Sequence, residues 1–158
     1  MQSRAYLIPL AGVGLLFLAF PVLIPVFAGA HMYSGPGCNG SIRSLTRSLS
    51  VYAQDNNETM PPADRWTEVL LSAGQSDRIL HDPRDVPKGS FGYAMRDSAS
   101  KAKLSQFGEP AHFAVFFDSC DLGPNANGSL KLLPSPGRHG GRNTIGYLDE
   151  HAKSLPMP

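Results

Sequence analysis

The sequence predicts an α+β domain behind an N-terminal transmembrane helix, and three observations lead to this prediction. An uncharged, apolar run occupies residues 5–30. Helical periodicity follows it, and short strand-like runs appear only beyond residue 80. Helices first and strands afterwards are typical of an antiparallel sheet packed against a helix. We therefore expect a membrane anchor with a Gly/Pro linker over residues 1–37. A soluble domain, with an amphipathic helix on a small antiparallel sheet, should occupy residues 38–158.

The apolar run is long enough to cross a bilayer. It holds 20 hydrophobic residues in 26, and as an unbroken helix it would reach about 39 Å, against roughly 30 Å of hydrocarbon. Pro9, Pro21 and Pro25 should kink it. The alternative is a cleaved secretory signal, for which Ala28-Gly29-Ala30 offers a small-residue site. Arg4 favours a cytoplasmic N-terminus, which would leave the domain on the periplasmic side of the inner membrane as a single-pass protein.

The charge of the remaining chain excludes some classes of partner. Residues 31–158 carry 13 Lys and Arg against 13 Asp and Glu, so this part offers no electrostatic footprint for nucleic acid. The chain also has no nucleophile elbow, no glycine-rich phosphate loop and no CxxC. We therefore expect neither an enzyme nor a small-molecule substrate.

Two helices are predicted before residue 80. The first spans residues 41–54, where apolar side chains recur at helical spacing at Ile42, Leu45, Leu49 and Tyr52. Asp64 should cap a second, shorter helix, and Gly74 should stop it in the left-handed conformation. The inner face of that helix is expected to be Trp66, Val69, Leu70 and Ala73.

Three strands are predicted after residue 80, over residues 90–96, 112–118 and 143–148. The second run is apolar almost throughout, which indicates a central place in the sheet. Asp149-Glu150-His151 should form the tight turn of a hairpin that returns through residues 152–155.

The most suggestive polar residues lie near the C-terminus. His139, Asp149 and His151 are metal-ligand types, and the spacing of the last two puts both on one face of a strand. A structural interpretation competes: Arg138 and His139 would open a glycine turn that leads into a strand, and Glu150 would belong to a hairpin turn. We favour structural turns for this motif.

A second group of oxygen donors could bind calcium. Asp118, Asp121, Asn125 and Asn127 fall within ten positions. Their spacing differs from that of a helix-loop-helix calcium site, so an Asx-rich surface turn is the favoured interpretation. His81-Asp82-Pro83 could pair an imidazole with a carboxylate, and a turn before proline explains it equally well.

The chain has two cysteines, Cys38 and Cys120. In an oxidising compartment a disulfide between them would close a large loop. Two buried free thiols are the alternative, and the spacing does not decide between them.

Residues 38–45 and 49–56, followed by Met60-Pro61-Pro62 and Trp66, together resemble the start of the soluble domain in bacterial type II secretion pseudopilin-like, type IV pilin-like proteins. Near the C-terminus, His139, nine intervening residues, Asp149 and then His151 resemble the family's His-X9-Asp-Gly motif. Residues 90–94 and 115–118 fall where the family has its Ser-Tyr strand and the end of its Phe-Asp strand.

The resemblance implies a structural role in an envelope assembly, with the membrane and other pilin-like subunits as partners and no catalysis. The chain departs from the family in three places. It lacks the Gly-Phe-Thr-Leu-Ile-Glu processing site, Glu150 replaces the usual Gly, and His81-Asp82-Pro83 stands where relatives have a Cys-Pro pair. The last departure would leave Cys120 as the only partner for Cys38.

Two functions follow as hypotheses. The first is a pseudopilin-like subunit whose apolar helices pack laterally in the membrane. The second is a stand-alone anchored extracytoplasmic binding module, with the loops at residues 82–89 and 121–128 as its recognition surface.

Overall fold

A computed structural model describes residues 37–82 and 86–157 of the chain. The expected membrane anchor, at residues 5–30, lies outside the described residues, as does nearly all of the predicted unit 1–37. In the described part of the chain, no helix is both long enough and apolar enough to cross a membrane. The described residues belong to one compact unit, which runs from Pro36 to Pro158.

The first described helix, α2 (Cys38–Asp55), forms where helical periodicity predicts one and begins three residues earlier. Its buried face includes Ile42, Leu45, Leu49 and Ala53, all without exposed surface. This face packs against the sheet, chiefly against its fourth strand. The approach is close: a Cβ on Gly146 would lie 2.4 Å from Ile42 Cγ2 and 2.8 Å from Thr46 Cγ2. Glycine is therefore required at position 146 for α2 to reach the sheet.

The second helix, α3 (Trp66–Ser72), confirms the predicted element, but the predicted cap is wrong. The residue before the helix is Arg65, and its side chain makes no capping hydrogen bond to the helix. Instead, Asn125 Oδ1 accepts a hydrogen bond from the Thr67 amide at 2.8 Å. Asn125 comes from a distant loop, so tertiary contact replaces the local cap that the sequence suggests. Gly74 follows the helix with φ +85°, as predicted.

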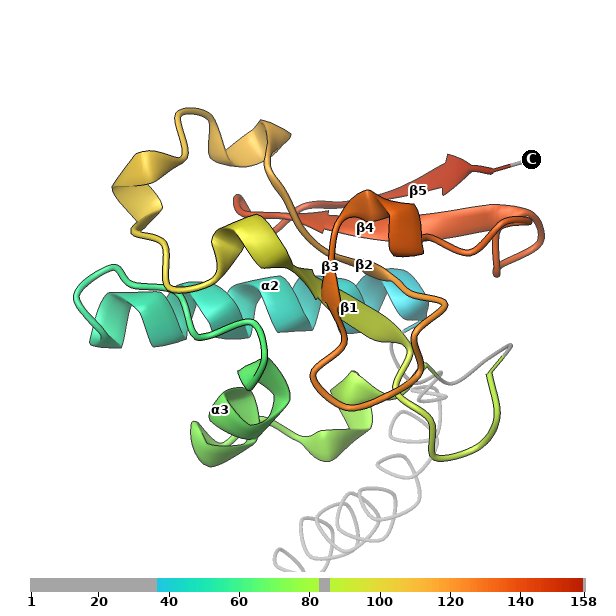
Figure 1. Ribbon diagram of the computed structural model, residues 1–158, viewed down its shortest axis with the longest axis horizontal. Helices are drawn as coiled ribbons and strands as arrows, with labels where there is room; N and C mark the ends of the chain where they lie inside the picture. Colours follow the sequence, from blue (N-terminus) through green and yellow to red (C-terminus); the bar gives the residue numbers. More distant parts are fainter. Residues whose placement is uncertain (1–36, 83–85, 158) are drawn as a thin grey trace, which may run out of the picture. The chain divides into compact units, whose positions relative to one another are not determined.

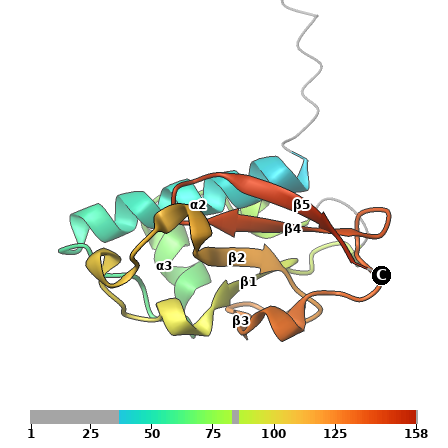
Figure 2. The same cartoon turned by 90° about the horizontal axis from the view of Figure 1, so that it is seen from above.

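Five strands form one sheet in the order β3-β1-β2-β4-β5 (Figures 1 and 2). They are β1 (Tyr93–Arg96), β2 (Ala114–Asp118), β3 (Asn127–Gly128), β4 (Arg142–Tyr147) and β5 (Ala152–Pro156). The three predicted strands and the hairpin return are confirmed within a few residues, and β2 is central as expected. Short 3-10 helices fill the connections, among them Asp77–Leu80, Pro110–His112 and Leu130–Leu132.

The sheet is mixed, which corrects the expectation of an antiparallel one. Neighbouring pairs among β1, β2, β4 and β5 are antiparallel. The two-residue strand β3, however, runs parallel to β1, with Met95 opposite Asn127 and Arg96 opposite Gly128. The backbone before β3 is fixed by Ala126, whose carbonyl accepts hydrogen bonds from the Met95 amide and the Trp66 indole, both at 3.0 Å. The loop is thereby tied to the sheet edge in the parallel direction.

The side chains of β2 are divided between two cores, which explains why its first four residues are all apolar. Phe116 joins the larger core, between the sheet and the two helices, where it lies 4.9 Å from Trp66 between ring centroids. Phe117 joins a smaller core on the opposite face, which residues 130–133 partly cover. A strand buried on both faces has no polar side to expose.

Candidate functional site

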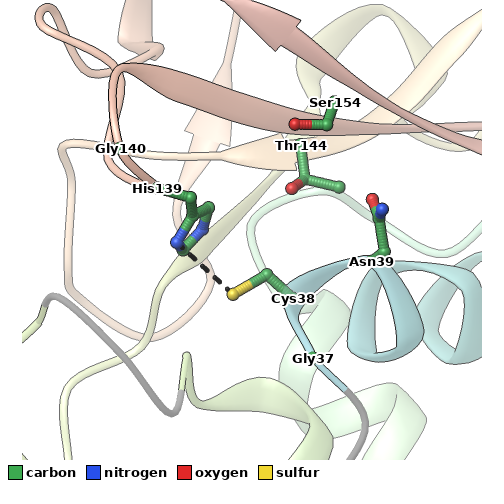
Figure 3. Close-up of a pocket in the computed structure, with 7 residues that line it drawn as sticks. All are labelled: Gly37, Cys38, Asn39, His139, Gly140, Thr144 and Ser154. Carbon is green, nitrogen blue, oxygen red and sulfur yellow. Dashed lines mark hydrogen bonds between the residues drawn. The ribbon is translucent and has the colours of Figure 1, made fainter.

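A group of polar side chains gathers where the N-terminus of α2 meets the turn before β4. Cys38 comes from the first turn of α2, while Arg138 and His139 come from the turn that leads into β4. Asp82 follows the 3-10 helix Asp77–Leu80, and Asp118 ends β2. Figure 3 shows the Cys38 side chain, from α2, and the His139 side chain, from the turn before β4, pointing toward one another.

Cys38 is a buried thiol with two polar neighbours. It donates a hydrogen bond to Asp82 Oδ1, with Sγ and Oδ1 3.2 Å apart, and its Sγ lies 3.5 Å from His139 Nδ1. Burial, the hydrogen bond to Asp82 and the negative charges of Asp82 and Asp118 raise the pKa of Cys38 to about 12. The thiol is therefore protonated at neutral pH and is not an activated nucleophile, which would need a lowered pKa.

Asp82 is held by a buried ion pair with Arg138. The Arg138 Nη1 atom lies 3.2 Å from Asp82 Oδ2, and neither side chain exposes more than 7 % of its surface. Arg138 also donates to the carbonyls of Gly92, at 2.9 Å, and Ser119. A Cβ on Gly92 would lie 2.4 Å from Asp82 Cβ, so glycine at that position leaves the space that Asp82 occupies. Arg138 thus fixes Asp82 against the end of the sheet.

His139 lies between the two carboxylates. Its Nε2 atom is 3.2 Å from Asp118 Oδ2 and 3.4 Å from Asp82 Oδ2. Asp118 is fully buried; its Oδ2 accepts a hydrogen bond from the Thr144 amide at 2.5 Å, and its Oδ1 has no hydrogen-bond partner. Burial raises the pKa of Asp118 to about 6, against the opposing effects of the Thr144 amide and the positive charge of His139 and Arg138. The site thus concentrates negative charge around one imidazole.

A pocket of about 490 Å³ opens beside this group. Cys38 and His139 line it together with Asn39, Thr144 and Ser154, as Figure 3 shows. The His139 side chain keeps 17 % of its surface exposed. Water and small ions can therefore reach the imidazole and the thiol, whereas the carboxylate of Asp82 lies behind them with no exposed surface.

The C-terminal motif is divided between the two ends of β4. Arg138 and His139 precede the strand through Gly140 and Gly141, which have φ +63° and +79°, so the predicted glycine turn is present. Asp149 and His151 follow the strand, roughly 20 Å away by the length of six extended residues. The candidate metal site that combines His139 with Asp149 and His151 is therefore contradicted by the structure.

Asp149, Glu150 and His151 form the hairpin turn between β4 and β5. The Tyr147 amide donates to the His151 carbonyl and the Glu150 amide to the Tyr147 carbonyl, both at 2.9 Å. Glu150 has φ +70°, a left-handed conformation that favours glycine. Partial burial acts to raise the pKa of Asp149. Hydrogen bonds from the His151 ring and amide outweigh this effect and hold the pKa below its usual value. This half of the motif closes a turn.

The candidate calcium ligands have separate partners. Asp118 faces His139, while Asn125 Oδ1 accepts from the amide and hydroxyl of Thr67. Asp121 Oδ1 accepts from the Gly123 amide at 3.0 Å, and the Asn127 side chain donates to the Asn125 carbonyl. Over residues 37–82 and 86–157, Asp118 and Asp121 belong to no group of three or more His, Cys, Asp or Glu side chains that could hold an ion. The bonds of Asp121 and Asn127 are local to an Asx-rich turn, whereas the Asn125 side chain caps α3.

Both cysteines are free thiols, and the Cys38–Cys120 disulfide is not formed. Cys38 faces Asp82 and His139, whereas Cys120 is exposed, so the alternative of two buried thiols holds for Cys38 alone. The sequence offers His81 as an imidazole partner for Asp82, or a turn before Pro83, but the imidazole beside Asp82 is that of His139. His81 instead contacts Asp77, with 3.2 Å between Nε2 and Oδ2.

Comparisons of the chain with protein-family models, with curated proteins and with solved structures give no match.

Proposed function

We propose that the protein is a membrane-anchored, pseudopilin-like structural component of an envelope secretion or filament assembly. It would be a single-pass protein of the inner membrane with its domain on the periplasmic side. The observation that carries the proposal is the placement of α2, which follows the apolar run in sequence and packs through Ile42 and Gly146 onto antiparallel strands. The resemblance implies this order of an apolar segment, a helix and a sheet.

The solvent-facing side of α2 is consistent with contacts between subunits. Arg43, Arg47 and Val51 are exposed at intervals of four residues, which places them along one stripe of the helix. Val51 exposes 50 % of its surface, the most among the large apolar side chains that are exposed in the described part of the chain. The two positive charges of this stripe would favour a neighbouring subunit that places acidic side chains against it.

In vivo photo-crosslinking tests the proposal. A photo-crosslinking amino acid is placed at each of positions 12 to 18 in turn, which samples every face of the apolar segment, and the full chain is irradiated in intact envelopes. We expect crosslinked homo- or hetero-oligomers from one face of this segment. The same residue in place of buried Leu49 is the matched control and should give no intermolecular product. Monomers from all seven positions would contradict an assembly role.

The pocket beside Cys38 favours a second candidate, a stand-alone anchored binding module. Its volume of about 490 Å³ falls within the usual range for small-ligand sites. The predicted recognition loop at residues 121–128 is less suitable, because Ala126 is buried and β3 pairs with β1. A gene neighbourhood without secretion ATPase or platform genes would favour this candidate, as would monomers in the crosslinking experiment.

A further inference from the structure

Within the described residues, one group of three metal-ligand side chains converges at a single point. One ligand atom from each of Cys38, Asp82 and His139 lies within 4.8 Å of the other two. The three residues come from separate parts of the chain, and all are wholly or largely buried. We propose that Cys38, Asp82 and His139 bind one zinc ion.

The separations between ligand atoms suit tetrahedral zinc. Zinc binds sulfur at about 2.3 Å and nitrogen or oxygen at about 2.0 to 2.2 Å, which places tetrahedral ligands roughly 3.3 to 3.7 Å apart. The Cys38 sulfur lies 3.2 Å from Asp82 Oδ1 and 3.5 Å from His139 Nδ1. The sulfur thus lies at about ligand separation from both other residues. All three ligand atoms lie within 4.8 Å of one another, so the Asp82 and His139 ligand atoms would approach each other by up to about 1.5 Å when the ion binds.

Asp118 has the position of the carboxylate that orients a zinc-binding histidine. A histidine that ligates through one ring nitrogen usually donates the other N–H to a carboxylate or carbonyl, which fixes the tautomer. With Nδ1 of His139 toward Cys38, the opposite nitrogen lies 3.2 Å from Asp118 Oδ2. The Thr144 amide holds that oxygen in place. Asp118 is a positioning residue for His139 and not a ligand.

The charges of the site fit a divalent cation with an affinity for sulfur. A Cys38 thiolate and the carboxylates of Asp82 and Asp118 supply three negative charges, and Arg138 supplies one positive charge beside Asp82. A divalent ion makes the buried group neutral. Because calcium and magnesium prefer all-oxygen ligands, thiolate and imidazole select zinc over them.

Three protein ligands leave one coordination position for water. The pocket beside Cys38 and His139 gives zinc a path into the site and gives that water a place. The neighbouring carboxylates disfavour the thiolate in the metal-free protein, and a bound cation reverses this effect because it attracts the charge that they repel. Zinc binding should therefore release the thiol proton.

Cobalt substitution tests the proposal on the full chain in detergent, after treatment with a chelator. We expect one Co²⁺ per chain, with a thiolate-to-cobalt charge-transfer band and the visible bands of four-coordinate cobalt, and stoichiometric zinc should abolish both. Cys38→Ser should remove the charge-transfer band, while the matched control Cys120→Ser should keep it. His139→Gln should weaken zinc binding at least tenfold, while His151→Gln should leave it unchanged. Circular dichroism verifies that each variant is folded.

Asp118→Asn tests the positioning role separately. It should weaken zinc binding about tenfold or more and shift the visible cobalt bands, while the charge-transfer band from Cys38 remains. Unchanged affinity and unchanged bands would overturn that role. Absence of a charge-transfer band from the folded wild-type chain would overturn the zinc site, as would zinc binding that survives both Cys38→Ser and His139→Gln. When calcium is added to the metal-free chain instead of zinc, we expect no rise in the melting temperature of the wild type or of the variants.

Discussion

His139 Nδ1 lies 3.5 Å from Cys38 Sγ, although 101 positions separate the two residues in the chain. Cys38 begins the segment that resembles the start of a pseudopilin domain, and His139 begins the C-terminal motif of the same resemblance. The fold thus brings these two segments to one place. Arg138 and Asp82 complete this contact, because their ion pair ties the turn before β4 to the segment after the first 3-10 helix.

The two thiols should differ sharply in reactivity. Cys120 is exposed, whereas Cys38 is buried and its pKa is raised to about 12. With chelator present at pH 8, we expect one thiol per chain to react rapidly with Ellman's reagent and a second only after unfolding in guanidinium. Cys120→Ser should remove the rapid phase. No reactive thiol even after unfolding would mean that the two cysteines are joined, contrary to this geometry.

Loss of Arg138 should destabilise the metal-free protein. Arg138→Met removes the guanidinium that is paired with the buried Asp82 carboxylate, and we expect a loss of about 3 kcal/mol in the free energy of unfolding. Asp82→Asn in the same chain should restore part of it, with a coupling of about 1 to 3 kcal/mol in a double-mutant cycle. Urea denaturation measures both. Purely additive effects would show that the two side chains do not form a pair in solution.

A methyl group at Gly146 should separate α2 from the sheet. Its Cβ would lie 2.4 Å from Ile42 Cγ2, so Gly146→Ala should lower the free energy of unfolding by about 2 kcal/mol, as overpacking does. Gly108→Ala is the matched control: a Cβ there meets no atom within 4 Å, and we expect a change within about 0.5 kcal/mol. Equal effects of the two substitutions would contradict the close helix-sheet packing.

Glu150→Gly should stabilise the hairpin between β4 and β5. A non-glycine residue at φ +70° carries a cost of about 1 to 2 kcal/mol, which exceeds the entropic cost of glycine, about 0.5 to 1 kcal/mol. We expect a net gain of about 0.5 kcal/mol or more in the free energy of unfolding. Glu150→Ala keeps the Cβ and should give no such gain. Destabilisation by Glu150→Gly would indicate that the glutamate side chain has a stabilising contact of its own.

Most of the fold could be predicted because its elements have local signals. The apolar spacing of Ile42, Leu45 and Leu49 defines α2, and the apolar run at residues 113–117 defines a buried central strand. What the sequence could not predict depends on distant contacts. A two-residue strand such as β3 has no periodicity, and the cap of α3 comes from Asn125, whose amide carbonyl replaces the local candidate Asp64.

The candidate site could be predicted only in part, for a related reason. The sequence marks His139 as a metal-ligand type and Cys38 as a thiol, but nothing in the spacing of positions 38, 82 and 139 indicates that the three residues meet. Proximity in sequence instead suggested grouping Asp118 with Asp121, and His139 with His151. Asp118 ends a strand and points to His139, whereas Asp121 belongs to the following turn, and the whole of β4 separates His139 from His151.

X-ray absorption at the zinc edge of the zinc-loaded full chain tests the central claim most directly. If Cys38, Asp82 and His139 hold the ion, the spectrum should fit one sulfur at about 2.3 Å and three nitrogen or oxygen neighbours at about 2.0 Å, with the outer-shell scattering of one imidazole. Cys38→Ser should remove the sulfur shell. A first shell of nitrogen and oxygen alone in the wild-type chain would contradict the site.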